Sequence, residues 1–96
     1  MVSYEDRFNY DFIPKFHMEC MLSYVNDGIP MGGFLTALFA NDLSRTFSRS
    51  DEENFEIIPV YVSFIHNEVP STCHGSYEIV KEWIRSKHDL SKEAIT

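Results

Sequence analysis

The sequence predicts an all-α fold, a compact bundle of four to five short helices in a single domain over residues 1–96. Apolar residues recur at three- and four-residue steps along most of the chain. Residues typical of helix starts and stops separate these stretches, and a chain of this length builds one core. The ends, residues 1–10 and 88–96, are expected to be flexible because chain termini are often poorly ordered.

The first helix is expected over residues 14–26, where Pro14 suits the first turn. It should end at Gly28, because glycine commonly follows the last helical turn, and Pro30 enforces the break. Its apolar face would hold Phe16, Cys20, Met21, Tyr24 and Val25.

The second helix is expected to run unbroken from about Gly32 to Ser48. Asn41 and Asp42 lie in its middle, although both residues are poor helix formers. We interpret Asp42 as a cap for a neighbouring segment in preference to a ligand contact, because buried polar groups are usually satisfied internally. The apolar stripe of this helix comprises Phe34, Leu35, Leu38, Phe39, Leu43 and Phe47.

A third helical region follows, with Ser50 to Glu53 as a capping box. Pro59 must either kink this helix or start a second one after a short first piece. Residues 57–65 are also β-branched and aromatic, so a strand competes locally, but the apolar spacing favours helix. A last helix is expected from Tyr77 to about Lys87, capped by Ser76.

The charge pattern excludes some functions. The formal net charge is −7, which repels nucleic acid at long range, and no helix has a basic recognition face, so direct DNA binding is disfavoured. No apolar stretch reaches the ~20 residues of a membrane span. With two cysteines and no signal peptide, we expect a cytoplasmic protein with reduced thiols.

From Gly28 to about Trp83 the chain resembles a family of small, largely uncharacterised proteins encoded by bacteriophages, prophages and plasmids. That family often has Cys-Trp-Gly-Ser where this chain has Cys73-His74-Gly75-Ser76. The resemblance implies a phage or mobile-element context and no activity. Together with the expected cytoplasmic location, this context places the protein in the host cell cytoplasm. The matching residues are Ile29-Pro30, Gly33-Phe34-Leu35, Ala37, Asn41-Asp42-Leu43, Arg49, Asp51, Asn54, Asn67-Glu68, Pro70-Ser71, Cys73, Gly75-Ser76 and Trp83.

The candidate ligand site is the helix start at Gly32, Gly33 and Phe34. Free amides at a helix start attract phosphate, although glycine also serves tight packing. Arg45 and Arg49 would supply positive charge, but in an unbroken helix they lie about 18–24 Å from Gly33. Only a second subunit could then bring them together, so a nucleotide pocket predicts a homo-oligomer. Two asparagines, Asn41 and Asn67, would read polar edges of the ligand.

Catalytic and metal motifs are weak. Cys73 and His74 are adjacent, and adjacent side chains rarely point at each other, so we expect no enzyme. A zinc site is disfavoured because its possible ligands lack compact spacing, and no cofactor is expected. Those possible ligands are His17, Cys20, His66, Cys73 and His74.

We therefore expect a phage-encoded, non-enzymatic counter-defence protein that sequesters a nucleotide-type immune signal as a homo-oligomer. One alternative is an acidic protein-binding inhibitor of a host defence complex, of the anti-CRISPR type. It would present Asp51, Glu52, Glu53 and Glu56 to a basic surface. The other alternative is a phage accessory factor without a defence role.

Overall fold

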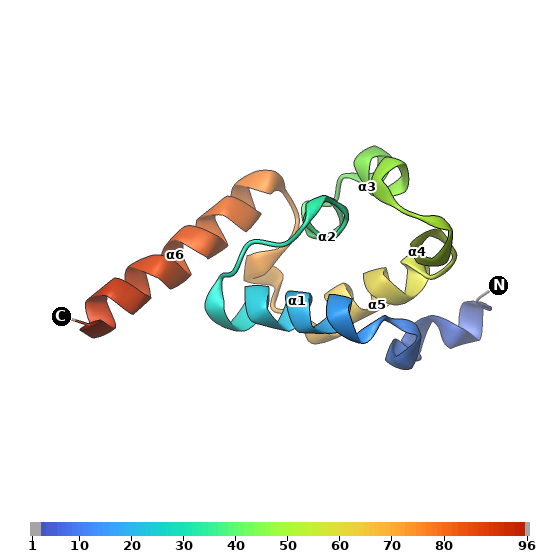
Figure 1. The fold of residues 1–96 in the computed structure, drawn as a ribbon, viewed down its shortest axis with the longest axis horizontal. Helices are drawn as coiled ribbons and strands as arrows, with labels where there is room; N and C mark the ends of the chain where they lie inside the picture. Colours follow the sequence, from blue (N-terminus) through green and yellow to red (C-terminus); the bar gives the residue numbers. More distant parts are fainter. Residues whose placement is uncertain (1–2, 96) are drawn as a thin grey trace.

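The computed structural model describes residues 3–95, with side chains up to residue 88. These residues form helices and no strand, which confirms the all-α prediction (Figure 1). The expected flexibility of residues 1–2 and 96 falls outside the described residues. The elements are η1 (Tyr4–Phe8), η2 (Tyr10–Phe12), α1 (Lys15–Asp27), α2 (Gly33–Phe39), α3 (Leu43–Arg49), α4 (Glu52–Glu56), α5 (Ile58–Glu68), η3 (Ser71–Cys73) and α6 (Tyr77–Ile95), where η marks a 3-10 helix.

Helix α1 begins and ends as expected. Pro14 directly precedes it, and Gly28 ends it in the left-handed conformation with φ 69°. Met21 and Tyr24 are fully buried, whereas Phe16 is 72% exposed. Phe16 was therefore wrongly placed on the buried face, because the helix turns it toward solvent.

The expected unbroken helix from Gly32 to Ser48 is wrong. Helix α2 ends at Phe39, Asn41 takes a positive φ of 61°, and α3 starts after Asp42. The Asp42 carboxylate accepts hydrogen bonds from the Arg45 amide (3.1 Å) and from the Tyr77 hydroxyl (2.7 Å). The interpretation of Asp42 as a structural cap is confirmed, and the break adds a helix to the four or five that were expected.

The structure shows whether Pro59 kinks one helix or begins a second one. Pro59 lies in the first turn of α5 and starts a new helix, where its missing N–H is tolerated. The competing strand over residues 57–65 is wrong. The cap of α4 is Asp51, whose carboxylate accepts a hydrogen bond from the backbone N–H of Asn54 at 2.7 Å. Ser50, the expected cap, instead donates from its hydroxyl to the Phe47 carbonyl.

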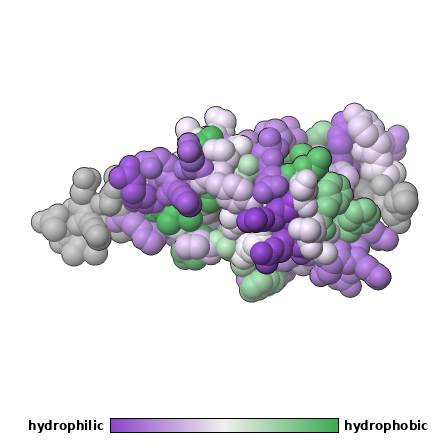
Figure 2. Space-filling view, turned by 90° about the horizontal axis from the view of Figure 1, so that it is seen from above, coloured by the Kyte–Doolittle hydropathy of each residue, from purple (hydrophilic) through white to green (hydrophobic). Residues whose placement is uncertain are grey.

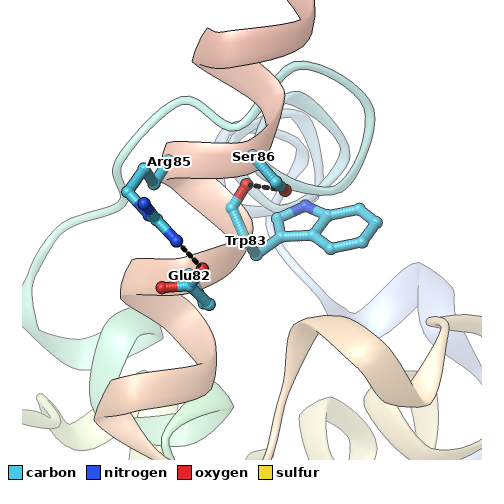
Figure 3. Close-up of polar contacts among 4 residues, drawn as sticks. All are labelled: Glu82, Trp83, Arg85 and Ser86. Atoms are coloured by element: carbon cyan, nitrogen blue, oxygen red, sulfur yellow. Dashed lines mark hydrogen bonds and ion pairs between the residues drawn. The ribbon is translucent and has the colours of Figure 1, made fainter.

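The last helix starts as predicted, with the Ser76 hydroxyl oxygen accepting from the Ile79 amide. It continues past Lys87 to Ile95, and its far end projects beyond the other helices (Figure 1). Trp83 ties α6 to α1, because its indole N–H donates to the Tyr24 carbonyl at 3.0 Å. Trp83 and Arg85 point to different sides of α6, and Arg85 pairs with Glu82 on the helix surface (Figure 3).

The core is built from all the long helices. Tyr24 and Phe39 pack edge to face with ring centroids 5.1 Å apart, which joins α1 to α2. Near the amino terminus, Tyr10 packs edge-on against Phe64 of α5 at 5.3 Å. The largest fully buried side chains are Tyr24, Tyr61, Phe39, Met21, Val60 and Cys73.

Candidate functional site

The break at Asn41 and Asp42 turns α3 back toward the start of α2. A Cβ placed on Gly33 would lie 3.3 Å from Nη1 of Arg49 and 3.6 Å from its Cδ. The guanidinium group therefore lies against Gly33 within one chain. The expected separation of about 18–24 Å is wrong, because it assumed an unbroken helix. A second subunit is thus not needed to bring an arginine to the glycine pair.

The surroundings of Arg49 leave its charge available. Gly32, Gly33 and Arg49 are all exposed. No side chain caps the start of α2 at Gly32. Within residues 3–95, the Arg49 guanidinium forms no ion pair or hydrogen bond. A positive group and an exposed glycine thus share one position on the surface, which we call the Arg49–Gly33 site.

The other predicted ligand residues lie elsewhere. Arg45 stands over the ring of Tyr77, with its Cζ 6.0 Å from the ring centroid. Phe34 is a core residue that packs edge-on against Tyr61 at 5.3 Å. Asn67 donates from its amide group to the Ser63 carbonyl at 2.8 Å. The seven predicted residues therefore do not form one pocket.

Asn41 borders a pocket that the sequence did not reveal. This pocket, which we call the α2–α5 pocket, has a volume of about 300 Å³. His66 and His74 meet there with ring centroids 5.5 Å apart at 73°. Burial, together with the nearby His66, lowers the pKa of His74. The residues that line the pocket include Leu38, Asn41, Val62, Ile65, His66, Ser71 and His74.

The sequence offered a partial signal for this pocket. Its loop of polar residues before the last helix included Ser71 and His74, which both line the pocket. Cys73 of the same loop is fully buried, with its thiol donating to the Pro70 carbonyl. Only the tertiary structure brings His66 and Asn41 to these loop residues.

An open hollow of about 390 Å³ lies between α3 and α4. Phe47 and Phe55 lie on it with ring centroids 5.4 Å apart, and both rings are largely exposed. Its rim carries the carboxylates of Asp51, Glu52 and Glu56. Figure 2 shows hydrophobic patches bordered by hydrophilic residues over the end of the molecule that carries α3 and α4. We call this feature the acidic hollow.

A series of hydrogen bonds between His17, Tyr61 and Asn54 supports the core between α1 and α5. Nδ1 of His17 lies 2.5 Å from the Tyr61 hydroxyl oxygen, and that hydroxyl donates to Oδ1 of Asn54 at 3.2 Å. Burial lowers the pKa of His17, against an opposing effect of Asp51. His17 therefore works as a structural group rather than as part of the three surface features above.

Among the residues that the structure describes, no group of three or more His, Cys, Asp or Glu is arranged to hold a metal ion. Cys20 and Cys73 are free thiols. No helix in the described part of the chain is both long enough and apolar enough to cross a membrane.

No protein-family model, curated protein or solved structure matches this chain. The resemblance to phage-encoded proteins therefore stays a prediction.

Proposed function

We propose that the protein binds and sequesters a small phosphate-bearing molecule of the nucleotide type, as a non-enzymatic counter-defence protein of a phage. The observation that carries the proposal is the Arg49 guanidinium lying against Gly33. A guanidinium forms two parallel hydrogen bonds to phosphate oxygens. Because glycine has no side chain, a phosphate at this position also reaches the backbone.

The overall charge favours a small ligand over a nucleic acid. The chain carries a formal net charge of −7, so a long polyanion is repelled by the rest of the surface. A single nucleotide or a cyclic oligonucleotide carries few negative charges and touches little of the surface, so it meets less of this repulsion. Local attraction by Arg49 then outweighs the diffuse repulsion, which is screened over about 8–10 Å at physiological salt.

Self-association is supported by apolar surface near this site. Phe16 of α1 and Ile29, which precedes the glycine pair, are both exposed. They line one shallow hollow, whose other lining residues are Glu19, Cys20, Ser23 and Pro30. Apolar residues that gather on a surface are typical of interaction sites. The proposed oligomer would bury this hollow, and its neighbouring subunits would complete the wall of the Arg49–Gly33 site.

The decisive experiment is calorimetric titration with a panel of cyclic di- and trinucleotides and linear mononucleotides. Arg49→Ala should weaken binding about tenfold or more, since it removes a charge-assisted contact. Arg45→Ala is the matched control on the same helix and should bind normally, because Arg45 faces Tyr77. Equal losses in both variants, or no binding by the unchanged protein, would contradict the proposal.

Native mass spectrometry of protein from cells with active nucleotide-signalling defence tests sequestration. We expect an oligomer with nucleotide-sized extra mass that is lost on mild denaturation. A ligand-free monomer would count against the oligomer and the sequestration for the signals present.

The acidic hollow favours one second candidate, inhibition of a host defence protein. A cationic side chain of a partner would stack on Phe47 and Phe55 and pair with the surrounding carboxylates. A Glu52→Gln/Glu56→Gln double variant separates the two functions in a phage infection assay. Loss of counter-defence in this variant, with normal activity in Arg49→Ala, would favour the second candidate. If neither variant changes phage growth in defended hosts, an accessory role without defence is the better explanation.

A further inference from the structure

The α2–α5 pocket gathers polar side chains that have no partner of their own. Asn41, His66, Ser71 and His74 all line it. Within residues 3–95, the side chains of these four residues form no hydrogen bond, and the two imidazoles only touch each other through their rings. Several free donors and acceptors around one concave surface are typical of a ligand site.

Backbone hydrogen bonds between lining residues fix the wall of the pocket. The Gly75 amide donates to the Phe39 carbonyl at 2.7 Å, which fixes the loop before α6 against the end of α2. The turn between α2 and α3 fixes the backbone of Asn41, because its backbone N–H donates to the Leu38 carbonyl. His66 lies in the last turn of α5. The polar groups thus come from three elements whose relative positions are set by the fold.

The lining chemistry selects an uncharged ligand. Among the residues that the structure describes, no Asp, Glu, Lys or Arg lines the pocket, and Leu38, Val62 and Ile65 give its lining an apolar part. A charged ligand would lose water there and gain no opposite charge. Burial and the adjacent His66 lower the pKa of His74, so this imidazole is neutral near pH 7 and both donates and accepts.

The polar groups and the volume of the pocket favour a flat heterocycle as ligand. Two imidazole rings offer faces and edges for aromatic packing. The Asn41 amide can donate and accept side by side, which matches neighbouring acceptor and donor atoms on the edge of a heterocycle such as adenine. The volume of about 300 Å³ is at the small end of ligand pockets, which begin at roughly 300 Å³.

We propose that the α2–α5 pocket binds an uncharged aromatic heterocycle of one or two fused rings, recognised by the Asn41 amide and the His66–His74 pair. This site is separate from the Arg49–Gly33 site and needs no phosphate. Its ligand class therefore extends beyond the function proposed above.

The test uses adenine as the probe, with the histidine ring signals followed by NMR in the presence of a chelator. We expect adenine to shift the ring signals of His66 and His74 in a saturable way, and to leave those of His17 unchanged. Absence of any shift up to the solubility limit of adenine would overturn the proposal. A shift caused by Zn²⁺ in a sample without chelator, with none caused by adenine, would overturn it as well, in favour of a metal site.

Two variants locate the binding. Asn41→Gly removes the amide but keeps the positive φ of 61° that glycine adopts freely, and it should weaken adenine binding about fivefold. Val62→Trp should fill the pocket and abolish binding, with the fold checked by circular dichroism. Arg49→Ala is the control and should bind adenine normally. If Asn41→Gly and Val62→Trp both bind adenine as the unchanged protein does, adenine binds elsewhere and the proposal fails.

Discussion

The guanidinium of Arg49 lies against Gly33, although 15 residues separate them along the chain, so α2 and α3 bring the end of one helix beside the start of the other. This contact depends on the left-handed turn at Asn41 and on the capping of α3 by Asp42. It places a free positive charge beside an exposed glycine in a protein that is otherwise acidic.

Gly33→Ala should disturb the Arg49–Gly33 site and leave the fold intact. The new methyl group would lie 3.3 Å from Nη1 of Arg49, a flexible side-chain end that can move away. We expect a severalfold loss of nucleotide affinity in calorimetry, with a change in unfolding free energy below about 1 kcal/mol. Gly32→Ala is the matched control, because no atom lies within 4 Å of its added methyl group. An equal loss in the two variants would show that the guanidinium position does not matter.

Gly28→Ala should strongly destabilise the protein. Gly28 has a φ of 69°, and a Cβ there would lie 2.5 Å from the Cβ of Lys87. The left-handed conformation costs about 1–2 kcal/mol for a residue other than glycine, and the overlap with α6 adds about 1–3 kcal/mol. Urea denaturation should therefore show a loss of about 2 kcal/mol or more, whereas Gly32→Ala should change stability little. Near-normal stability of Gly28→Ala would mean that the junction of α1 and α6 is looser than described.

Tyr24→Phe should destabilise the core. The Tyr24 ring is fully buried, and its hydroxyl donates to the Cys73 carbonyl at 2.7 Å. The substitution leaves this carbonyl without that donor, at a cost of about 1–3 kcal/mol in unfolding free energy. Tyr10→Phe is the control, since the Tyr10 hydroxyl bonds to Glu68 in an exposed position, and its effect should be smaller. Equal effects in chemical denaturation would argue against a specific role for the buried bond.

The stability of the protein should fall as the pH drops below about 6.5. Burial lowers the pKa of His17 in the folded state, so below its ordinary value of about 6.5 the unfolded chain binds more protons than the folded one. The contribution of neutral His17 is complete above that value and is lost as the pH falls toward its folded pKa. His74 acts in the same direction.

Urea unfolding at pH 7.5, 6.5 and 5.5 measures this dependence. His17→Gln should flatten it in part, because the titrating group beside Tyr61 is removed. A stability that rises between pH 7.5 and 5.5 would contradict the assignment of His17 as a buried neutral group.

Local signals in the sequence were enough to predict the helical class and several helix ends. Gly28 and Pro14 bound α1, and Ser76 caps α6, because each residue acts on its own backbone or on amides three residues away. Pro59 left two alternatives, and the structure chose the start of α5. The end of α6 was missed because no stop residue follows Lys87, and helix α6 simply continues to Ile95.

The candidate sites depended on contacts that no local pattern encodes. The apolar period continues through Asn41 and Asp42, so the sequence by itself predicted one unbroken helix. In such a helix Arg49 would lie far from Gly33. The structure breaks the helix because Asp42 also accepts a hydrogen bond from Tyr77, 35 residues later. Helix propensity differs by less than about 1 kcal/mol among ordinary residues, and the long-range contact of Asp42 with α6 outweighs it. Sequence determined which segments are helical, and long-range packing decided where they turn and which side chains meet.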